Sequence, residues 1–206
     1  MKKYRLTEET IRVGNRTLYR IQALRDFGEV KEGELGGYIE AEKNLSQCCN
    51  AWVSGNAWVS GNARVYGNAW VYGNARVSDD ARVSGDSRVS DDARVSGNAW
   101  VYGNAWVYGN ARVSDDARVS GDSRVSGDAD IKTAGDICSM SGFGSEYRTT
   151  TAFRTKNGDV HVSCGCFFGS LEEFCQRVES THGNNLYGRE YKKMIEMLKI
   201  HFEVEP

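Results

Sequence analysis

Proline, long apolar runs and an excess of one charge are all missing from this sequence of 206 residues. Its one proline is the last residue, and its 26 basic and 28 acidic side chains give a formal net charge of −2. This balance gives no overall attraction to polyanions, although local basic stripes can still occur. No apolar run approaches the ~18 residues of a transmembrane helix, and Met1 to Tyr4 lead into polar sequence rather than a signal-peptide core. We therefore expect a soluble protein of the cytoplasm.

Cysteine and histidine are scarce as well. Six cysteines are too few and too unevenly spread for a disulfide scaffold in a chain of this length, so we expect free thiols. The three histidines lie at positions 161, 182 and 201, after the central part of the chain. The length itself suggests one or two domains.

A six-residue repeat runs from about residue 44 to residue 137. Every sixth position from Val53 to Ile137 holds valine or isoleucine, without a break. A small residue precedes each of them by two positions, and a large polar or aromatic residue stands between, as in Ala69-Trp70-Val71. This order predicts a short strand whose first and third side chains point inward and whose middle one points outward. The remaining residues are rich in Gly, Asn and Asp, which favour a bend.

Short strands that always bend in the same sense cannot form a hairpin sheet, but they can form a coil. Three sides close a coil of about 18 residues, and stacked coils hydrogen-bond in parallel at roughly 4.8 Å. A disordered low-complexity tract is the alternative, but disorder does not require valine at every sixth place. Residues 65–90 and 101–126 are also identical, at an offset of two whole coils, which keeps each residue on its own face.

The repeat, for example Val71-Tyr72-Gly73-Asn74-Ala75-Arg76, resembles that of the hexapeptide-repeat superfamily. The resemblance implies a mainly β fold, a left-handed parallel β-helix of about five triangular coils. We expect three parts: an N-terminal β cap (1–43), the solenoid (44–138) and a C-terminal α+β domain of a hairpin and two helices (139–206). Ile39 and Leu45 continue the inward small position with larger side chains, which would plug the first coil.

The two ends are similar to those of a recurring group of uncharacterised bacteriophage and prophage proteins. The segments that carry this similarity are LYRIQAL at 18–24, GGYIE at 36–40, NLS at 44–46 and CGCFFGSLEEF at 164–174. The group implies an architecture and a viral setting, and hence the cytosol of a bacterial host, more than a mechanism.

Outward residues that are 18 apart should form rows on three faces. The first row is Trp52, Trp70, Arg88, Trp106 and Arg124; the second is Trp58, Arg76, Arg94, Arg112 and Asp130; the third is Arg64, Arg82, Trp100, Arg118 and Asp136. All five tryptophans are thus expected to face outward. Exposed aromatic area at this density favours an interface, either of a homotrimer, as is common in hexapeptide-repeat proteins, or with a ligand or partner. Alternatively, the rings only cover the backbone of a thin solenoid.

The candidate binding residues are the aromatic and arginine side chains of these faces: Trp52, Trp70, Tyr72, Arg88, Trp106, Tyr108, Trp100, Tyr102, Arg76, Arg94 and Arg112. Aspartates at the bends are expected to neutralise the arginines through ion pairs between coils. Double-stranded nucleic acid is therefore not an expected partner, and neither is a membrane.

Catalysis would need residues that the repeat lacks. The resemblance to hexapeptide-repeat acyltransferases implies a histidine as general base, and the carbonic anhydrases of this fold need three histidines on zinc. No histidine lies in the repeat. We therefore predict no enzyme activity and no cofactor. His161, Cys164, Cys166 and Cys175 form a weak metal candidate, because their spacing matches no standard zinc site.

The leading hypothesis is a trimeric binding protein of phage or prophage type. It would engage a host protein or sequester a small anionic, nucleotide-like ligand. One alternative is an acyltransferase with a nonstandard base, either His161 or His182. The other alternative is a structural scaffold.

Overall fold

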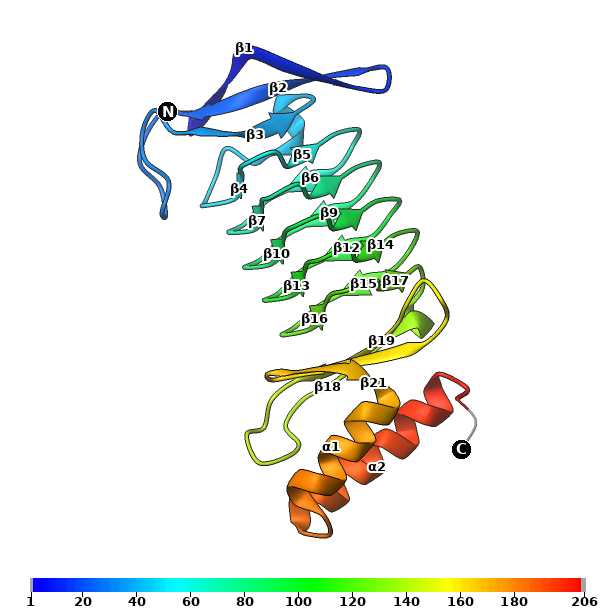
Figure 1. The fold of residues 1–206 in the computed structure, drawn as a ribbon. Coiled ribbons are helices and arrows are strands. Elements are labelled where there is room, and N and C mark those ends of the chain that lie inside the picture. Colours follow the sequence, from blue (N-terminus) through cyan, green and yellow to red (C-terminus); the bar gives the residue numbers. More distant parts are fainter. Residues whose placement is uncertain (1, 205–206) are drawn as a thin grey trace.

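The computed structural model describes residues 2–204 and shows three parts stacked along one axis (Figure 1). An N-terminal cap of antiparallel strands lies at one end, a three-sided β-solenoid of about five turns forms the middle, and a sheet with two helices lies at the other end. The predicted fold class is thereby confirmed. No helix in residues 2–204 combines the length and the apolar character needed to cross a membrane.

The solenoid consists of two-residue strands, each made of the outward residue and the valine or isoleucine that follows it. They are β4 (Trp52–Val53), β5 (Trp58–Val59), β6 (Arg64–Val65), β7 (Trp70–Val71), β8 (Arg76–Val77), β9 (Arg82–Val83), β10 (Arg88–Val89), β11 (Arg94–Val95), β12 (Trp100–Val101), β13 (Trp106–Val107), β14 (Arg112–Val113), β15 (Arg118–Val119), β16 (Arg124–Val125) and β17 (Asp130–Ile131).

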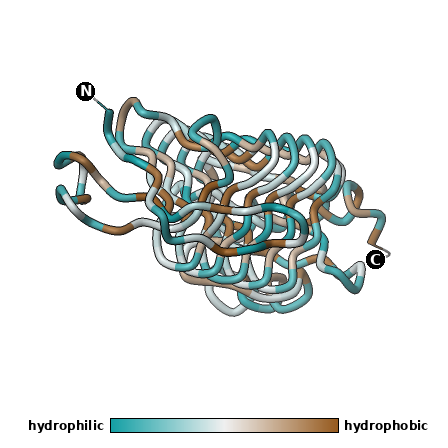
Figure 2. Tube along the Cα trace, turned by 90° about the horizontal axis from the view of Figure 1, so that it is seen from above, coloured by the Kyte–Doolittle hydropathy of each residue, from teal (hydrophilic) through white to brown (hydrophobic). Residues whose placement is uncertain are grey.

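Every third strand pairs in parallel, in register, with the strand one coil away. Face 1 is the sheet β4-β7-β10-β13-β16, face 2 contains β5-β8-β11-β14-β17, and face 3 is β6-β9-β12-β15. The valines and the small residues two positions before them are buried in one continuous core from Ala51 to Ile131. Viewed from above, hydrophilic and hydrophobic stretches recur at the same places in successive coils (Figure 2). The prediction that the valines and the small residues point inward is therefore confirmed.

The solenoid ends earlier than the aliphatic series of the sequence. Ile131 is the last buried member, while Ile137 begins β18 (Ile137–Met140), an antiparallel strand. Asp136, predicted for face 3, lies instead in the short 3₁₀ helix η2 (Ala134–Asp136). The chain leaves the coil here because it turns into the C-terminal sheet.

The N-terminal cap is β1 (Tyr4–Val13), β2 (Arg16–Ala23) and β3 (Leu35–Ile39), followed by the 3₁₀ helix η1 (Glu42–Asn44). Strand β3 pairs in parallel with β5, so the cap continues the sheet of face 2. Ile39 and Leu45 are buried, which confirms that they fill the first coil. They lie opposite Val59 and Val65, however, and so take the aliphatic rather than the small position. Two extra residues before Ala51 cause this shift of register.

The C-terminal part is an antiparallel sheet of β18, β19 (Thr150–Arg154), β20 (Val160–Cys164) and β21 (Phe167–Ser170), with α1 (Leu171–His182) and α2 (Leu186–His201). The predicted hairpin joins β19 and β20. The predicted capping box starts α1, because Ser170 Oγ accepts from Glu173 N at 3.1 Å and Ser170 N donates to Glu173 Oε2 at 2.8 Å. A second apolar core lies between this sheet and the helices.

Candidate binding surfaces

Trp52, expected on the outside of face 1, is only 1% exposed. Its side chain does leave the coil, but the N-terminal cap covers it. The rings of Phe27 and Tyr4 approach edge-on, with centroids 5.3 and 6.4 Å from that of Trp52. Gly36 lies so close that a Cβ there would be 2.7 Å from the indole. The prediction that Trp52 belongs to a binding surface is therefore wrong, and this residue is part of the core.

Two other tryptophans are half-buried and packed against their own chain. Trp100 Nε1 donates to Ser84 Oγ at 3.2 Å, and the indole lies 4.7 Å from the ring of Tyr102. Trp106 Nε1 donates to Ser90 Oγ at 3.3 Å, and its ring lies 4.9 Å from that of Tyr108. These contacts favour the interpretation that the rings cover the backbone of the solenoid.

The expected ion pairs between arginines and bend aspartates do not form. No arginine of the repeat makes an ion pair among residues 2–204. Aspartates at the bends instead accept hydrogen bonds from asparagines one coil earlier, as from Asn68 to Asp86 at 2.9 Å and from Asn74 to Asp92 at 3.2 Å. Bends stack on bends, whereas the arginines rise from the faces, so the aspartates bond along their own columns even where both kinds of side chain line the same opening.

The arginine row of face 2 is therefore a stripe of exposed positive charge. Arg76, Arg94 and Arg112 lie in register on successive coils. Arg76 reaches over the ring of Trp58, with its guanidinium carbon 5.9 Å from the centroid, which is a cation–π arrangement. Farther along the stripe, a hollow of about 240 Å³ also contains Asp92, Asp128 and Lys156. Its charges are mixed.

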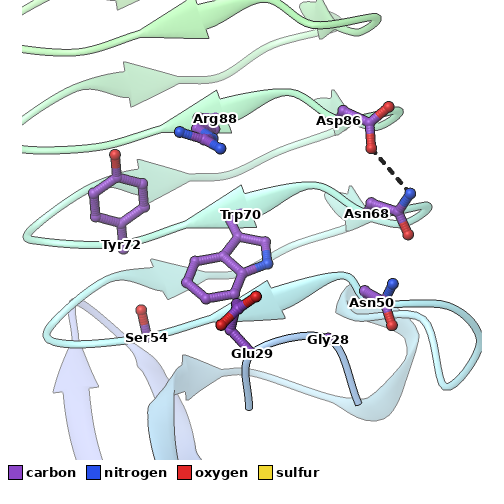
Figure 3. A pocket seen from close by; sticks show the side chains of 9 residues that line it. All are labelled: Gly28, Glu29, Asn50, Ser54, Asn68, Trp70, Tyr72, Asp86 and Arg88. Carbon is purple, nitrogen blue, oxygen red and sulfur yellow. Dashed lines mark hydrogen bonds between the residues drawn. The ribbon is translucent and has the colours of Figure 1, made fainter.

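A cleft of about 520 Å³ opens on face 1 beneath the loop between β2 and β3. We call residues 24–34 the cap loop and this opening the cap-loop cleft. Its lining comes from the cap loop and three coils: Gly28, Glu29, Asn50, Ser54, Asn68, Trp70, Tyr72, Asp86 and Arg88 (Figure 3). The cap loop is held by paired backbone hydrogen bonds between Phe27 and Val30 at 2.9 and 3.0 Å.

Trp70 is the aromatic residue of this cleft, and it differs from its counterpart Trp106. Its indole makes no hydrogen bond within residues 2–204, and its nitrogen faces away from Ser54 (Figure 3). Arg88, one coil farther on, is exposed and also free of side-chain partners among these residues. Asp86 is held by Asn68. The cleft thus offers an indole face and one unpaired guanidinium.

Sequence reasoning placed Trp70, Tyr72 and Arg88 correctly side by side on face 1 but missed the polar rim. Asn68 and Asp86 could have been found, because they are 18 residues apart and therefore stack like the tryptophan row. Glu29 had no such signal, since the cap loop has no period.

The four residues of the weak metal candidate are not brought together. His161 and Cys164 lie on β20, Cys166 follows on an exposed turn, and Cys175 lies on α1. No three His, Cys, Asp or Glu side chains in residues 2–204 form a group that could hold a metal ion. Cys164 instead accepts from Thr150 Oγ1 at 3.2 Å, and burial raises the pKa of Cys175. These thiols are packing residues of the second core.

The coils match one family model, described as the YdcK beta solenoid repeat. The matches cover residues 57–73, 69–85, 75–91, 87–103, 93–109, 105–121 and 111–127. The coils of this chain are similar to the YdcK repeat. Together the matches include the Trp70 and Arg88 side of the cap-loop cleft, but neither the cap loop nor the C-terminal sheet and helices. No curated protein matches the chain. The YdcK similarity therefore concerns the solenoid, and the phage setting stays a prediction.

Proposed function

We propose that this chain is a non-enzymatic binding protein that takes a small ligand in the cap-loop cleft. The ligand would carry a planar ring, which stacks on Trp70, and one anionic group, which pairs with Arg88. A cleft of about 520 Å³ is of the size that commonly holds a small molecule. Stacking on an aromatic side chain contributes roughly 1–3 kcal/mol per nucleobase.

The observation that carries this proposal is the difference between Trp70 and Trp106. Both lie in the same local sequence and Trp70 packs at its base against the core, yet within residues 2–204 only Trp106 donates a hydrogen bond from its indole nitrogen and packs its ring against the following tyrosine. The ring that lacks these contacts is the one in the cleft. A ligand would supply a face-to-face contact there without displacing an existing one, and the parallel coils hold the platform rigid, which favours affinity.

The charges of the cleft limit the class of ligand. Arg88 is its one cation, whereas Glu29 and Asp86 are carboxylates. Asp86 is bound to Asn68, but its charge remains. A ligand with several negative charges would be repelled, so a singly charged, nucleotide-like molecule fits better than a triphosphate.

The positions of the histidines support binding rather than acyl transfer. His161 packs edge-on against Phe168, and His182 stacks on Tyr191 with ring centroids 5.6 Å apart. Both lie in the C-terminal part, and neither lines the cap-loop cleft. The homotrimer, the host-protein partner and the phage setting stay predictions that accompany this proposal.

Native mass spectrometry of the protein purified from expressing cells tests the proposal, with Trp70→Ser compared with Trp106→Ser. We expect a bound small molecule on the wild type and on Trp106→Ser, and its loss from Trp70→Ser. Titration with 3′,5′-cyclic nucleoside monophosphates, whose phosphodiester carries a single negative charge, followed by tryptophan fluorescence, is the second measurement. Equal retention by the two variants would contradict the site. A wild type without adduct and without a saturable fluorescence change would contradict the function.

A further inference from the structure

A second pocket, of about 360 Å³, lies at the N-terminal end of face 3. Its lining is Lys43, Ser46, Arg64, Val65, Tyr66 and Arg82. We call it the Lys43 pocket. We infer that it binds the phosphate group of a small soluble molecule. This site lies on a different face from the cap-loop cleft and is independent of the function proposed for that cleft.

The charge of the lining is the first argument. Three cationic side chains and two hydroxyl groups face the pocket, and none of the lining residues is acidic. The hollow on face 2 and the cap-loop cleft both contain carboxylates. Of these three openings, the Lys43 pocket is therefore the one whose charge favours a dianion.

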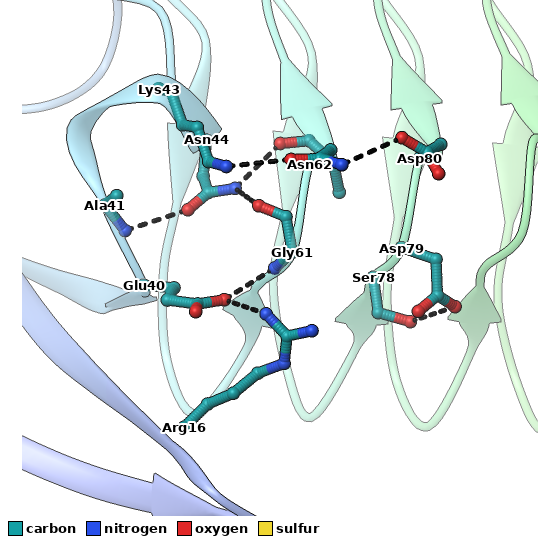
Figure 4. Close-up of polar contacts among 11 residues, drawn as sticks. Arg16, Glu40, Ala41, Lys43, Asn44, Gly61, Asn62, Ser78, Asp79 and Asp80 are labelled. Carbon is teal, nitrogen blue, oxygen red and sulfur yellow. Dashed lines mark hydrogen bonds and ion pairs between the residues drawn. The ribbon is translucent and has the colours of Figure 1, made fainter.

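The acidic residues of the neighbouring bends already have partners, as Figure 4 shows. Glu40 accepts from Gly61 N at 2.6 Å and from Arg16 at 2.7 Å, and these bonds lower the pKa of its carboxyl group. Asp80 accepts from Asn62 at 3.1 Å, and Asp79 accepts from Ser78 at 3.0 Å. Neither Arg64 nor Arg82 forms an ion pair with a carboxylate of residues 2–204.

The backbone holds the two guanidinium groups on adjacent rungs. Arg64 and Arg82 pair in register on β6 and β9, at the roughly 4.8 Å spacing of parallel strands. Like charges directly opposite each other destabilise a sheet, and an anion between them would remove that repulsion. Guanidinium forks match the oxygens of a phosphate group in geometry as well as in charge.

The remaining donors are also fixed in place. Asn62 Oδ1 accepts from Lys43 Nζ at 2.8 Å, which keeps the ammonium at the rim (Figure 4). Ser46 N donates to Val65 O at 2.9 Å, so the backbone that carries the Ser46 hydroxyl is tied to the coil. Preorganised donors of this kind lose little entropy when an anion binds.

The residue that immediately precedes each copy of the duplicated segment offers an internal comparison. Trp100 stands where Arg64 would recur two coils later, and it packs against Tyr102. Beside Lys43 the row thus begins with the pair Arg64 and Arg82, whereas two coils later Trp100 stands before Arg118. Tyr66, the counterpart of Tyr102, has no ring partner in the described residues and lines the pocket.

Isothermal titration calorimetry with inorganic phosphate and with AMP tests this inference, with sodium chloride of equal ionic strength as the control for screening. The test variant is Arg64→Gln/Arg82→Gln. The matched control is Arg94→Gln/Arg112→Gln, another exposed in-register pair, which lies on face 2. We expect saturable binding by the wild type and the control. The test variant should lose about tenfold or more in affinity, because charged hydrogen bonds contribute roughly 1.5–3 kcal/mol each.

The two ligands distinguish the source of the phosphate. The comparison is made in Trp70→Ser, which lacks the indole of the cap-loop cleft. Tighter binding of AMP than of phosphate by this variant would indicate a nucleotide whose base reaches Tyr66, and equal binding would indicate recognition of the phosphate group alone. Three results would overturn the inference. The first is a heat signal that does not saturate, and the second is an equal loss of affinity in the two double variants. The third is an affinity for phosphate that neither Lys43→Gln nor Arg64→Gln/Arg82→Gln changes. Trp70→Ser should leave phosphate binding intact, which separates this result from the test of the cap-loop cleft.

Discussion

Residues 65–90 and 101–126 have the same sequence but different surroundings. In the second copy, Trp106 stacks above Arg88, donates to Ser90 and packs against Tyr108. In the first copy, Trp70 lies next to the buried Trp52, beneath the cap loop, and among the described residues it makes neither the hydrogen bond nor the ring contact of Trp106. The backbone of both copies is the same repeat of strand and bend. The use of each outward side chain is therefore decided by the coil or cap beside it rather than by its own sequence.

The same difference applies at the bends, and it gives the prediction with the largest effect. Gly85 and Gly121 occupy equivalent positions, with φ of 71° and 63°. A Cβ on Gly85 would lie 2.7 Å from Gly103 O in the next coil, whereas at Gly121 no atom of the described structure lies within 4 Å. Gly121 has this space because the chain has left the coil below it.

We expect Gly85→Ala to lower the free energy of unfolding by roughly 3–5 kcal/mol. The left-handed φ disfavours alanine, and the new Cβ would clash with the backbone of Gly103, which is fixed by its own coil. Gly121→Ala should cost only the conformational part, roughly 1–2 kcal/mol. Urea denaturation followed by circular dichroism measures both values. Equal losses would mean that the coils separate easily, which would contradict the close stacking described here.

The second prediction concerns the lysine that fastens the cap above the first copy. The Lys3 side chain is fully buried, and its Nζ donates to Ala51 O at 2.7 Å and to the carbonyls of Cys48 and Cys49 at 3.4 Å. Lys3→Met should lower the free energy of unfolding by about 1–3 kcal/mol, because the buried carbonyl of Ala51 loses its donor. The emission of Trp70 should change more than that of Trp106, as measured in single-tryptophan backgrounds.

Lys3 also makes stability depend on pH. Burial lowers its pKa from 10.5 to about 8. Between these values the unfolded chain binds more protons than the folded one, so the free energy of unfolding rises with pH from about 8 to 10.5. Below this window the ammonium is charged in both states and the contribution is constant. Urea denaturation at several pH values should show this rise in the wild type and a smaller one in Lys3→Met; identical slopes would contradict the assignment.

The solenoid could be predicted from the sequence because one physical requirement, burial of a branched side chain, recurs at every sixth residue. The burial of Trp52 could not, because its own coil directs it outward and its cover comes from the cap, through Tyr4, Phe27 and Gly36. The missing pairs of arginine and aspartate have a similar cause. Opposite charge alone suggested ion pairs between arginines and aspartates. The bends of successive coils stack into columns of their own, however, and there Asp86 accepts a hydrogen bond from Asn68.

The candidate sites depend even more on residues outside the repeat. Both the cap-loop cleft and the Lys43 pocket are formed where the irregular N-terminal segment meets the first coils, through Glu29 and Lys43. Two extra residues at the start of the solenoid shift Ile39 and Leu45 into the valine register. The six-residue period carries no information about how the N-terminal segment packs on the first coils. The two candidate sites could therefore be located only from the structure.

The third prediction has the smallest expected effect. It compares Trp106 with Trp70 by removing one serine hydroxyl group beside each of them. Ser90 and Ser54 hold the same place relative to Trp106 and Trp70. Ser90 is buried and accepts from Trp106 Nε1 at 3.3 Å, whereas Ser54 accepts nothing from Trp70 within the described residues. Ser90→Ala should therefore cost roughly 0.5–1.5 kcal/mol, and Ser54→Ala should remain within about 0.5 kcal/mol of the wild type.

Urea denaturation of the two serine variants measures this difference, since both remove the same atom from equivalent positions. A cost at Ser54 as large as that at Ser90 would show that Trp70 uses its serine as Trp106 does. Trp70 would then be engaged within the chain as Trp106 is, and the proposal of a ligand in the cap-loop cleft would lose its main support. A difference between the variants that disappears after Lys3→Met would instead indicate that the cap holds Trp70 apart from Ser54.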